Sequence, residues 1–557
     1  MQRSRLLPLA AAVLLAAATD AADETVDLGV VTRIRDEGFH HSRVMETVEH
    51  LSDVIGPRLT GSAPLREANE WTRRQLADWG LTNAHLEPWG PFGRSWSLGR
   101  IAVTLVRPQQ RVPLYALPKA WSPPTAGAVR GAVLRVDIKS EKDFDQYRGK
   151  LTGKVLLLDK PRDLGEPAEP TAPAAAKERR LSAEKLAEVA EFKAGRERTP
   201  EQVKERIART KLRKALAKFL AEQKALATVE ESRLDWLGIG VSGTYAYKKA
   251  DDPGVPALVM AAESYNRLAR LLDKGQDVEL EIDLAVSFSA DDEMAYNTVA
   301  EIQGGDKRRE VVMAGAHLDS WHAGTGATDN AAGCAVVMEA VRILAALHLQ
   351  PRRTVRIALW SGEEEGLLGS SAYVAQHFGS RAEPADPEQR ELPSYLRTDS
   401  APLTIKPEHA RLAAYFNVDN GSGKIRGIYA QENAAARPIF AAWLAPFHDL
   451  GADTVSLRAV GSTDHVAFDR VGLPAFQFIQ DPLDYESHTH HTDADVFDHL
   501  QRDDLMQAAV VVASLLYDAA MRPEILPRKP LPQTAKASPP TASRPAGGQP
   551  RGKAPAG

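Results

Sequence analysis

From about residue 297 onward, the chain repeats one pattern: a short apolar run, a loop, and a segment with apolar residues at helical spacing. This alternation is typical of an α/β fold with a largely parallel sheet. We therefore expect a mixed, largely parallel sheet flanked by helices. Functional side chains are then expected at one edge of the sheet, because ligands bind beyond the carboxyl ends of its parallel strands.

Four apolar runs in this half end in side chains that bind metal ions. The runs are 311–316, 354–360, 412–418 and 473–479. They lead, in order, to His317 and Asp319, to Glu363, Glu364 and Glu365, to Asp419, and to His488, His490 and His491. These side chains are expected to converge on one rim, although they are far apart in the sequence.

A further acidic residue, Asp329, lies in a glycine-rich segment before an apolar helical pattern. Alone it would be read as a helix N-cap, but beside the other clusters it is a candidate ligand. Carboxylates and imidazoles without a thiolate suit zinc, and leave manganese or cobalt open. A carboxylate can bridge two ions about 3.5–4 Å apart. A neighbouring carboxylate that is not a ligand can accept a proton from the attacking water.

Composition narrows the classes of protein. The single cysteine, Cys334, excludes an intramolecular disulfide framework and a cysteine-rich zinc module. The formal net charge of −5 argues against a nucleic-acid footprint over the whole protein. We therefore expect no nucleic-acid partner and a metal site built from histidines and carboxylates.

The two ends of the chain differ from the rest. Residues 1–22 combine two arginines, an apolar alanine-rich run and small residues, which is typical of a cleaved signal peptide. A buried N-terminal helix is the alternative. The run is short for a bilayer span, so we expect a secreted or periplasmic protein without a stable membrane anchor. Residues 526–557 are rich in Pro, Ala, Lys and Ser and are predicted to be a disordered tail.

A charged segment interrupts the first half of the chain. Short β-like runs occur at 129–136, 154–158, 255–260 and 278–286. Between them, 172–232 alternates Lys and Arg with Glu and carries apolar residues at helical spacing. Because acids are interleaved with the bases, a solvated helical hairpin inserted in a loop is favoured over a nucleic-acid surface.

Four motifs follow one another along the second half. They are His317-Leu-Asp-Ser-Trp321 with Gly326-Ala-Thr-Asp-Asn330, Gly362-Glu-Glu-Glu-Gly-Leu-Leu-Gly-Ser370, Asn417-Val-Asp419, and His491-Thr-Asp-Ala-Asp495. Together they resemble those of the co-catalytic zinc exopeptidases (clan MH), the family of secreted bacterial leucyl aminopeptidases and plasma glutamate carboxypeptidase. The segment 55–62, Ile-Gly-Pro-Arg-Leu-Thr-Gly-Ser, resembles the carboxypeptidase branch in particular.

The resemblance implies a site with two zinc ions per chain. His317 and Asp419 would hold one ion and Glu364 and His491 the other, with Asp329 bridging them. Because its distance to Asp495 matches the family spacing, His491 is preferred to His490, which stays an alternative.

The resemblance implies roles for three more side chains. Glu363 would be the general base. Asp319 would orient the imidazole of His317, a role outside the ligand set. His465 resembles a family segment near the substrate cleft, where it either binds substrate or is structural.

The implied fold is the zinc exopeptidase fold with an inserted small β-rich, protease-associated domain. The domains would be a signal peptide at 1–22, a discontinuous catalytic domain over 30–120 and 256–522, and an insert over 121–255 that contains the charged segment 172–232. The role of the charged segment is open, although near the cleft it could restrict substrate size.

The leading functional hypothesis is a secreted exopeptidase of peptides, specifically an aminopeptidase, in which two zinc ions activate water and Glu363 takes its proton. The alternative is a carboxypeptidase or dipeptidase of the same family, supported by 55–62 and 317–321. A single-zinc glutaminyl cyclase or a binding protein with a decayed site fits less well, because all five ligand positions are present. The oligomeric state is left open.

Overall fold

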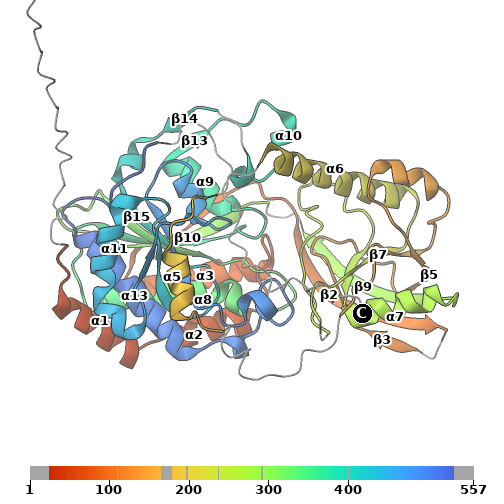
Figure 1. Ribbon diagram of the computed structural model, residues 1–557, viewed down its shortest axis with the longest axis horizontal. Coiled ribbons are helices and arrows are strands. Elements are labelled where there is room, and N and C mark those ends of the chain that lie inside the picture. Colours follow the sequence, from red (N-terminus) through yellow and green to blue (C-terminus); the bar gives the residue numbers. More distant parts are fainter. Residues whose placement is uncertain are drawn as a thin grey trace, which may run out of the picture.

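The computed structural model describes residues 24–531 except for seven short gaps. The gaps are 109–110, 165–178, 196–198, 236, 290–292, 391 and 398–400. The expected signal peptide and residues 532–557 of the expected tail lie outside the described residues. The described chain forms two units side by side, each built on a sheet of eight strands (Figure 1).

The larger unit contains the mixed sheet that the sequence predicts. Its strand order is β1-β10-β12-β11-β15-β18-β16-β17. The strands are β1 (Thr82–Trp89), β10 (Ala295–Ile302), β12 (Thr354–Trp360), β11 (Val311–His317), β15 (Leu412–Asn417), β18 (Ala475–Gln480), β16 (Ile425–Tyr429) and β17 (Thr454–Ser456). The central strands β12, β11, β15 and β18 are parallel to one another. The prediction of a mixed, largely parallel sheet is confirmed.

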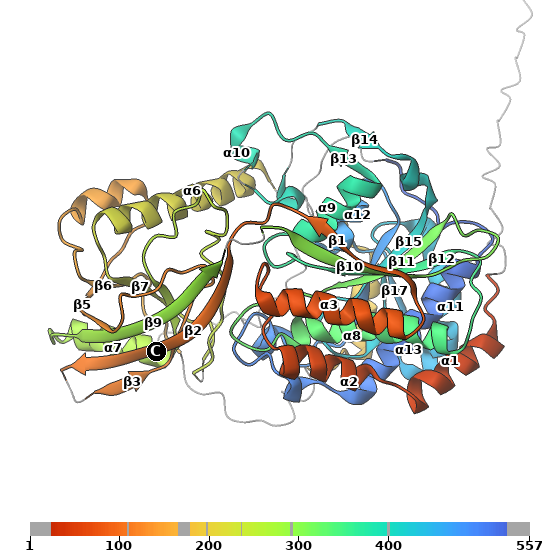
Figure 2. The same cartoon turned by 180° about the vertical axis from the view of Figure 1, so that it is seen from behind.

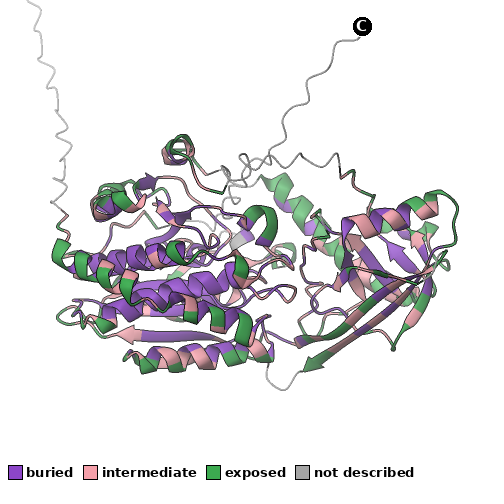
Figure 3. Ribbon diagram, turned by 90° about the horizontal axis from the view of Figure 1, so that it is seen from below, coloured by how far each residue is buried: buried purple, intermediate pink, exposed green. Residues whose placement is uncertain are grey.

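Helices cover both faces of this sheet (Figure 2). One face carries α1 (Leu28–His40), α2 (Val44–Glu49), α3 (Ala63–Asp78), α8 (Ala332–Ala346), α11 (Arg437–Leu444) and α13 (Arg502–Met521). The other face carries α9 (Leu368–His377) and α12 (His465–Asp469). Within the described residues, α13 is the one helix long and apolar enough to cross a membrane, and 89 % of its apolar window is buried inside the protein (Figure 3).

The smaller unit contains the second sheet, of order β3-β2-β9-β5-β6-β7-β8-β4. Its strands are β2 (Ser95–Arg107), β3 (Val112–Leu114), β4 (Ala116–Pro118), β5 (Val129–Arg135), β6 (Val155–Leu157), β7 (Ala227–Glu231), β8 (Ala257–Met260) and β9 (Glu279–Ser289), with α7 (Ala262–Asp273) after β8. Because β2 and β9 pair along their whole length, this unit spans 95–289. The predicted boundaries of 121 and 255 are therefore too narrow.

The charged segment forms two helices, α5 (Ala183–Ala190) and α6 (Pro200–Glu222). Thr199 and Gln202 form a capping box that begins α6. The helices do not pair as the expected hairpin, because their buried side chains belong to different clusters. Instead, α6 returns the chain from β6 to the parallel strand β7, a connection that requires a long crossover.

The first residues of the expected tail are ordered and packed. Leu526 is buried, and the Arg528 guanidinium donates to the carbonyls of His409 and Leu412 at 2.8 and 2.7 Å. The prediction of disorder from residue 526 is therefore wrong for 526–531. Composition shows few apolar residues here, but it cannot show that one leucine and one arginine find partners in a distant loop.

Aromatic side chains fill the joint between the two units. This aromatic joint consists of Trp89, Phe92, Trp96, Trp121 and Trp321. The Trp121 ring lies 6.1 Å from Phe92 and 6.4 Å from Trp321 between centroids. The joint therefore connects the second sheet to the loop that follows β11.

Candidate metal centre

The carboxyl ends of the parallel strands in the larger unit surround one cavity of about 340 Å³. The expected ligands all line it: His317, Asp329, Glu364, Asp419 and His491. His317 is the last residue of β11, Glu364 and Asp419 follow β12 and β15, and His491 lies in the loop after β18. The convergence expected from the strand ends is present in the structure.

Asp329 lies between two imidazoles and faces each with a different oxygen. Its Oδ1 is 3.1 Å from Nε2 of His317, and its Oδ2 is 3.3 Å from Nε2 of His491. Nε2 of His317 is also 3.4 Å from Oδ1 of Asp419, and Nε2 of His491 is 2.9 Å from Oε2 of Glu364. The five side chains therefore form two groups that share one carboxylate, the geometry of a bridged pair of ions.

The donor set requires a cation that the protein does not supply. Oδ2 of Asp329 and Oε1 of Glu364 are buried and accept no hydrogen bond from the described residues. Burial raises the pKa of Glu364 well above its ordinary value, and the nearby carboxylate of Asp329 raises it further. Among the described residues, no Lys or Arg lines the cavity. Three carboxylates and two imidazoles in this state fit divalent ions such as zinc.

Hydrogen bonds to two other loops hold the loop that carries Asp329. The carboxylate of Asp495 accepts the Thr328 N–H at 2.6 Å, the Thr328 hydroxyl at 2.8 Å and the Asp329 N–H at 3.1 Å. The amide of Asn330 donates to the Val418 carbonyl at 2.9 Å. The Asp329–Asn330 peptide bond is cis. The hydrogen bonds to Asp495 and Val418 leave the carboxylate of Asp329 directed at the cavity.

Arg58, in the 55–62 segment, also supports the loops that follow β11 and precede Asp329. Its fully buried guanidinium donates to the carbonyls of Leu318 at 2.8 Å and Gly326 at 2.9 Å. Gly326 has φ +62°, and a Cβ there would lie 2.3 Å from Cβ of Ser320. Sequence analysis used this segment only as a family marker and missed its support of the site. The available signal was an arginine inside a turn of small and apolar residues.

Asp319 contacts the imidazole of His317 through its main-chain carbonyl. Nδ1 of His317 lies 3.0 Å from the main-chain carbonyl oxygen of Asp319, and 3.7 Å from the nearer carboxylate oxygen. The carboxylate instead accepts the N–H groups of Glu363 and Glu364 at 3.3 and 3.2 Å, and the Thr60 hydroxyl at 3.0 Å. It therefore holds the glutamate loop, while its carbonyl orients the imidazole.

Two other histidines of the sequence analysis take different positions. Nε2 of His490 is 4.0 Å from Oδ2 of Asp329, farther than that of His491, and the two rings are tilted by 44° with centroids 4.0 Å apart. His465 is fully buried and does not line the cavity. Its Nε2 lies 3.1 Å from the Val460 carbonyl, so it supports the cavity loop 460–463. Its burial favours the structural alternative of the two that the sequence leaves open.

Glu363, the expected base, lines the cavity without belonging to either ligand pair. Burial raises its pKa well above the ordinary value, Asp419 and Asp464 raise it further, and His317 opposes them. Sequence analysis missed Asp464, which is fully buried and whose pKa burial raises to about 8. Its position directly before His465 was the available signal.

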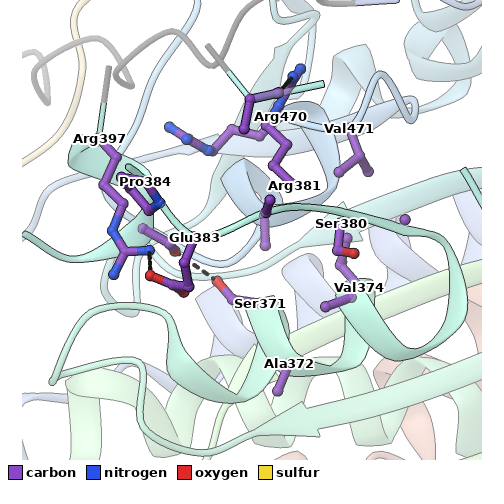
Figure 4. A pocket seen from close by; sticks show the side chains of 16 residues that line it. Ser371, Ala372, Val374, Ser380, Arg381, Glu383, Pro384, Arg397, Arg470 and Val471 are labelled. Carbon is purple, nitrogen blue, oxygen red and sulfur yellow. Dashed lines mark hydrogen bonds and ion pairs between the residues drawn. The ribbon is translucent and has the colours of Figure 1, made fainter. Parts of the chain in front are cut away.

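A second cavity on the outer side of α9 has the opposite charge. It measures about 280 Å³ and is lined by Arg381, Arg397 and Arg470, with Glu383 as its carboxylate (Figure 4). None of its lining residues lines the carboxylate cavity. The metal-binding chemistry therefore belongs to the cavity at the strand ends.

The α/β fold has a mixed sheet, and a carboxylate–imidazole cluster lies at the carboxyl edge of its parallel strands. This combination is typical of a metal-dependent enzyme. Residues 297–516, which carry all five candidate ligands, match Peptidase family M28. The resemblance stated from the motifs is confirmed.

Known proteins match well beyond the family segment. Carboxypeptidase Q of Bos taurus is 26 % identical over 493 residues, which cover 88 % of each chain. The crystal structure of a peptidase M28 precursor from Shewanella amazonensis matches with a TM-score of 0.63 and 23 % identity, over 90 % of this chain and 98 % of that one. A zinc aminopeptidase from Bacillus subtilis matches with a TM-score of 0.53 and 19 % identity, over 89 % and 96 %. Both units therefore have counterparts in known folds.

Proposed function

We propose that this metallo-exopeptidase is of the carboxypeptidase or dipeptidase type. The sequence match to carboxypeptidase Q covers 88 % of both chains. The likeness to the zinc aminopeptidase, at 19 % identity, is a likeness of fold. The comparisons therefore favour the alternative hypothesis of the sequence analysis over the aminopeptidase that led it.

The observation that carries the enzymatic proposal is the placement of Asp329 between His317 and His491. Two zinc ions, when bound there, polarise the scissile carbonyl and lower the pKa of the attacking water. Glu363 lines the same cavity and is free of the ligand pairs. In our proposal it accepts the proton of the attacking water and returns it to the leaving amine, a role that a raised carboxyl pKa suits.

An aminopeptidase is the second candidate, and the charge of the cavity favours it. Glu486 lines the cavity, with a side chain that is 64 % exposed. A free ammonium would be attracted to this carboxylate, whereas a substrate carboxylate would meet no cation among the described lining residues. In a dipeptide the only peptide bond is both first and last, so the two activities coincide.

The test compares a free dipeptide with its N-acetylated and C-amidated forms. A carboxypeptidase loses more kcat/KM on amidation, an aminopeptidase loses more on acetylation, and a strict dipeptidase loses it on both. Addition of a chelator to the free-dipeptide reaction is expected to abolish turnover. Turnover that survives complete metal removal would overturn the proposal.

We also propose that the chain is exported, as its N-terminal residues suggest. Mass spectrometry of the protein recovered from the periplasm or medium would then show a first residue between Thr19 and Asp23. Recovery of the intact N-terminus from the cytoplasm alone would contradict export.

A further inference from the structure

Helix α5 of the charged segment lies against the larger unit. Leu186 and Val189 pack against Ile479 of β18. The Ser456 hydroxyl donates to the Val189 carbonyl at 2.6 Å, and the Arg458 guanidinium donates to the Glu188 and Glu191 carbonyls. The helix is therefore attached through both side chains and backbone.

Helix α6 bridges the two units (Figure 1). It has 23 residues, so it is about 34 Å long. Near its start, Val203 and Ile207 are buried against Leu392 and Leu396 of the larger unit. Near its end, the Phe219 ring stacks on Phe144 of the smaller unit at 4.3 Å. One helix is thus held by apolar contacts at both ends.

The surface that receives the start of α6 is a long excursion between β13 (Gly379–Arg381) and β14 (Leu403–Ile405). Glu388 on this excursion forms an ion pair with Lys211 of α6. Beneath it lies the arginine-lined cavity, in which Arg397 holds Glu383 at 2.9 Å (Figure 4). The excursion is therefore fixed by its own ion pair as well as by α6.

Helices α5 and α6 each contact a tyrosine that lines the catalytic cavity. Tyr429 lines the cavity and also packs against the α5 cluster. Tyr245 lines it too, and the Arg213 guanidinium of α6 lies 4.7 Å from the centre of its ring. Tyr245 in turn contacts Trp321, whose ring is 6.0 Å from that of His491. Two walls of the cavity are thus supported by one inserted segment.

We infer that α5 and α6 form a fixed strap behind the Tyr429 and Tyr245 walls of the catalytic cavity, and that this strap limits substrates to short peptides by holding those walls in place. The inference rests on the proposed exopeptidase function. The cavity of about 340 Å³ is near the lower end of small-ligand sites, about 300–1,000 Å³. A longer peptide needs the two tyrosine walls to move apart, and the strap behind them is attached to both units.

The test releases the strap without touching the metal centre. Ile207→Asp places a charge in the buried contact with the excursion, and Ala208→Asp places the same charge on the adjacent exposed position as its control. Unblocked peptides of increasing length are assayed with each variant. We expect Ile207→Asp to raise kcat/KM for an octapeptide by about tenfold or more and to change that for a dipeptide by less than about twofold. Ala208→Asp should match the wild type for both.

A second variant approaches the same contact from the larger unit. Leu392→Asp should relax the length limit as Ile207→Asp does, because both remove one apolar contact. Retained dipeptide turnover shows that each variant keeps a folded metal centre. Unchanged length dependence in both variants, or an equal loss for all lengths, overturns the strap. A wild type that cleaves no dipeptide overturns the proposed function instead, so the two failures are distinguishable.

Discussion

The two sheets differ in how acidic side chains at their strand ends are balanced. In the second sheet, carboxylates also gather at the ends of parallel strands, but protein cations neutralise them. Glu231 at the end of β7 lies 3.4 Å from the Arg162 guanidinium, and Glu230 lies 2.7 Å from the Lys119 ammonium. In the larger unit's sheet, the ion-pair partners that the described residues offer to the carboxylates of Asp329 and Glu364 are imidazoles.

This difference separates a structural cluster of acids from a metal centre. The topology is the same in both places, because parallel strands bring their carboxyl ends to one edge. What differs is whether the chain provides a counter-charge. A cluster of buried carboxylates that lacks one requires an ion from outside. The charge balance therefore identifies the functional edge more sharply than the mere presence of acids.

The largest expected effect comes from Glu363→Gln. Removing the group that takes the water's proton should lower kcat by about 10²–10⁴-fold, while zinc content measured by mass spectrometry stays at two ions per chain. The matched control is Glu230→Gln, which removes a carboxylate from the second sheet and should leave kcat unchanged. Near-normal turnover of Glu363→Gln would refute its role as base.

Metal removal should distinguish the two edges by stability. If zinc balances the first edge, chelation should lower the free energy of unfolding by at least about 2.7 kcal/mol, the stabilisation from a ligand at one hundred times its Kd. In Asp329→Asn, which lacks the bridging carboxylate, the chelator should have little further effect. Urea denaturation with and without chelator measures both. Equal sensitivity of the two proteins would contradict the bridging role.

Breaking the counter-charge of the second sheet should cost less and should not depend on metal. Arg162→Ala removes the guanidinium beside the buried carboxylate of Glu231, at an expected cost of about 1–3 kcal/mol in unfolding free energy. Arg209→Ala, which removes an exposed pair with Glu205, is the control and should cost far less. If the loss of unfolding free energy in Arg162→Ala depended on chelator, the distinction between the two edges would be contradicted.

The smallest effect concerns a histidine that has protein carboxylates as partners. Burial lowers the pKa of His377, but hydrogen bonds and charges from Glu87 and Glu408 outweigh burial, and the net pKa is raised. A raised folded pKa means that the stabilisation is complete below pH 6.5 and is lost as the pH rises through the folded pKa. His377→Gln should remove this pH dependence, worth under about 1 kcal/mol, in urea denaturation at pH 5.5 and 8.5. An unchanged slope would show that the pair contributes nothing.

Local sequence patterns predicted the strand ends that carry the ligands. Apolar runs such as 354–360 coincide with strands because a strand buried on both faces needs continuous apolar residues. The order of the motifs then placed all five ligand candidates at one cavity. These features depend on residues close together in the sequence, so the sequence alone reveals them.

Non-local contacts were beyond the same patterns. The pairing of β2 with β9 joins residues almost two hundred positions apart. No hydrophobic periodicity in the sequence predicts this pairing. The buried guanidinium of Arg58 and the contact of Ile207 with Leu392 are of the same kind. Helical spacing shows that a face will be buried, but it does not show against what.

The aromatic joint gives the molecule an internal optical reporter. Four of the nine tryptophans, Trp89, Trp96, Trp121 and Trp321, lie in this one cluster, and Trp321 lies beside His491. Ultraviolet fluorescence of the unlabelled protein should therefore respond both to the seating of one unit on the other and to the occupancy of the neighbouring ligand shell. Titration of zinc into the metal-free chain can be followed by emission alone.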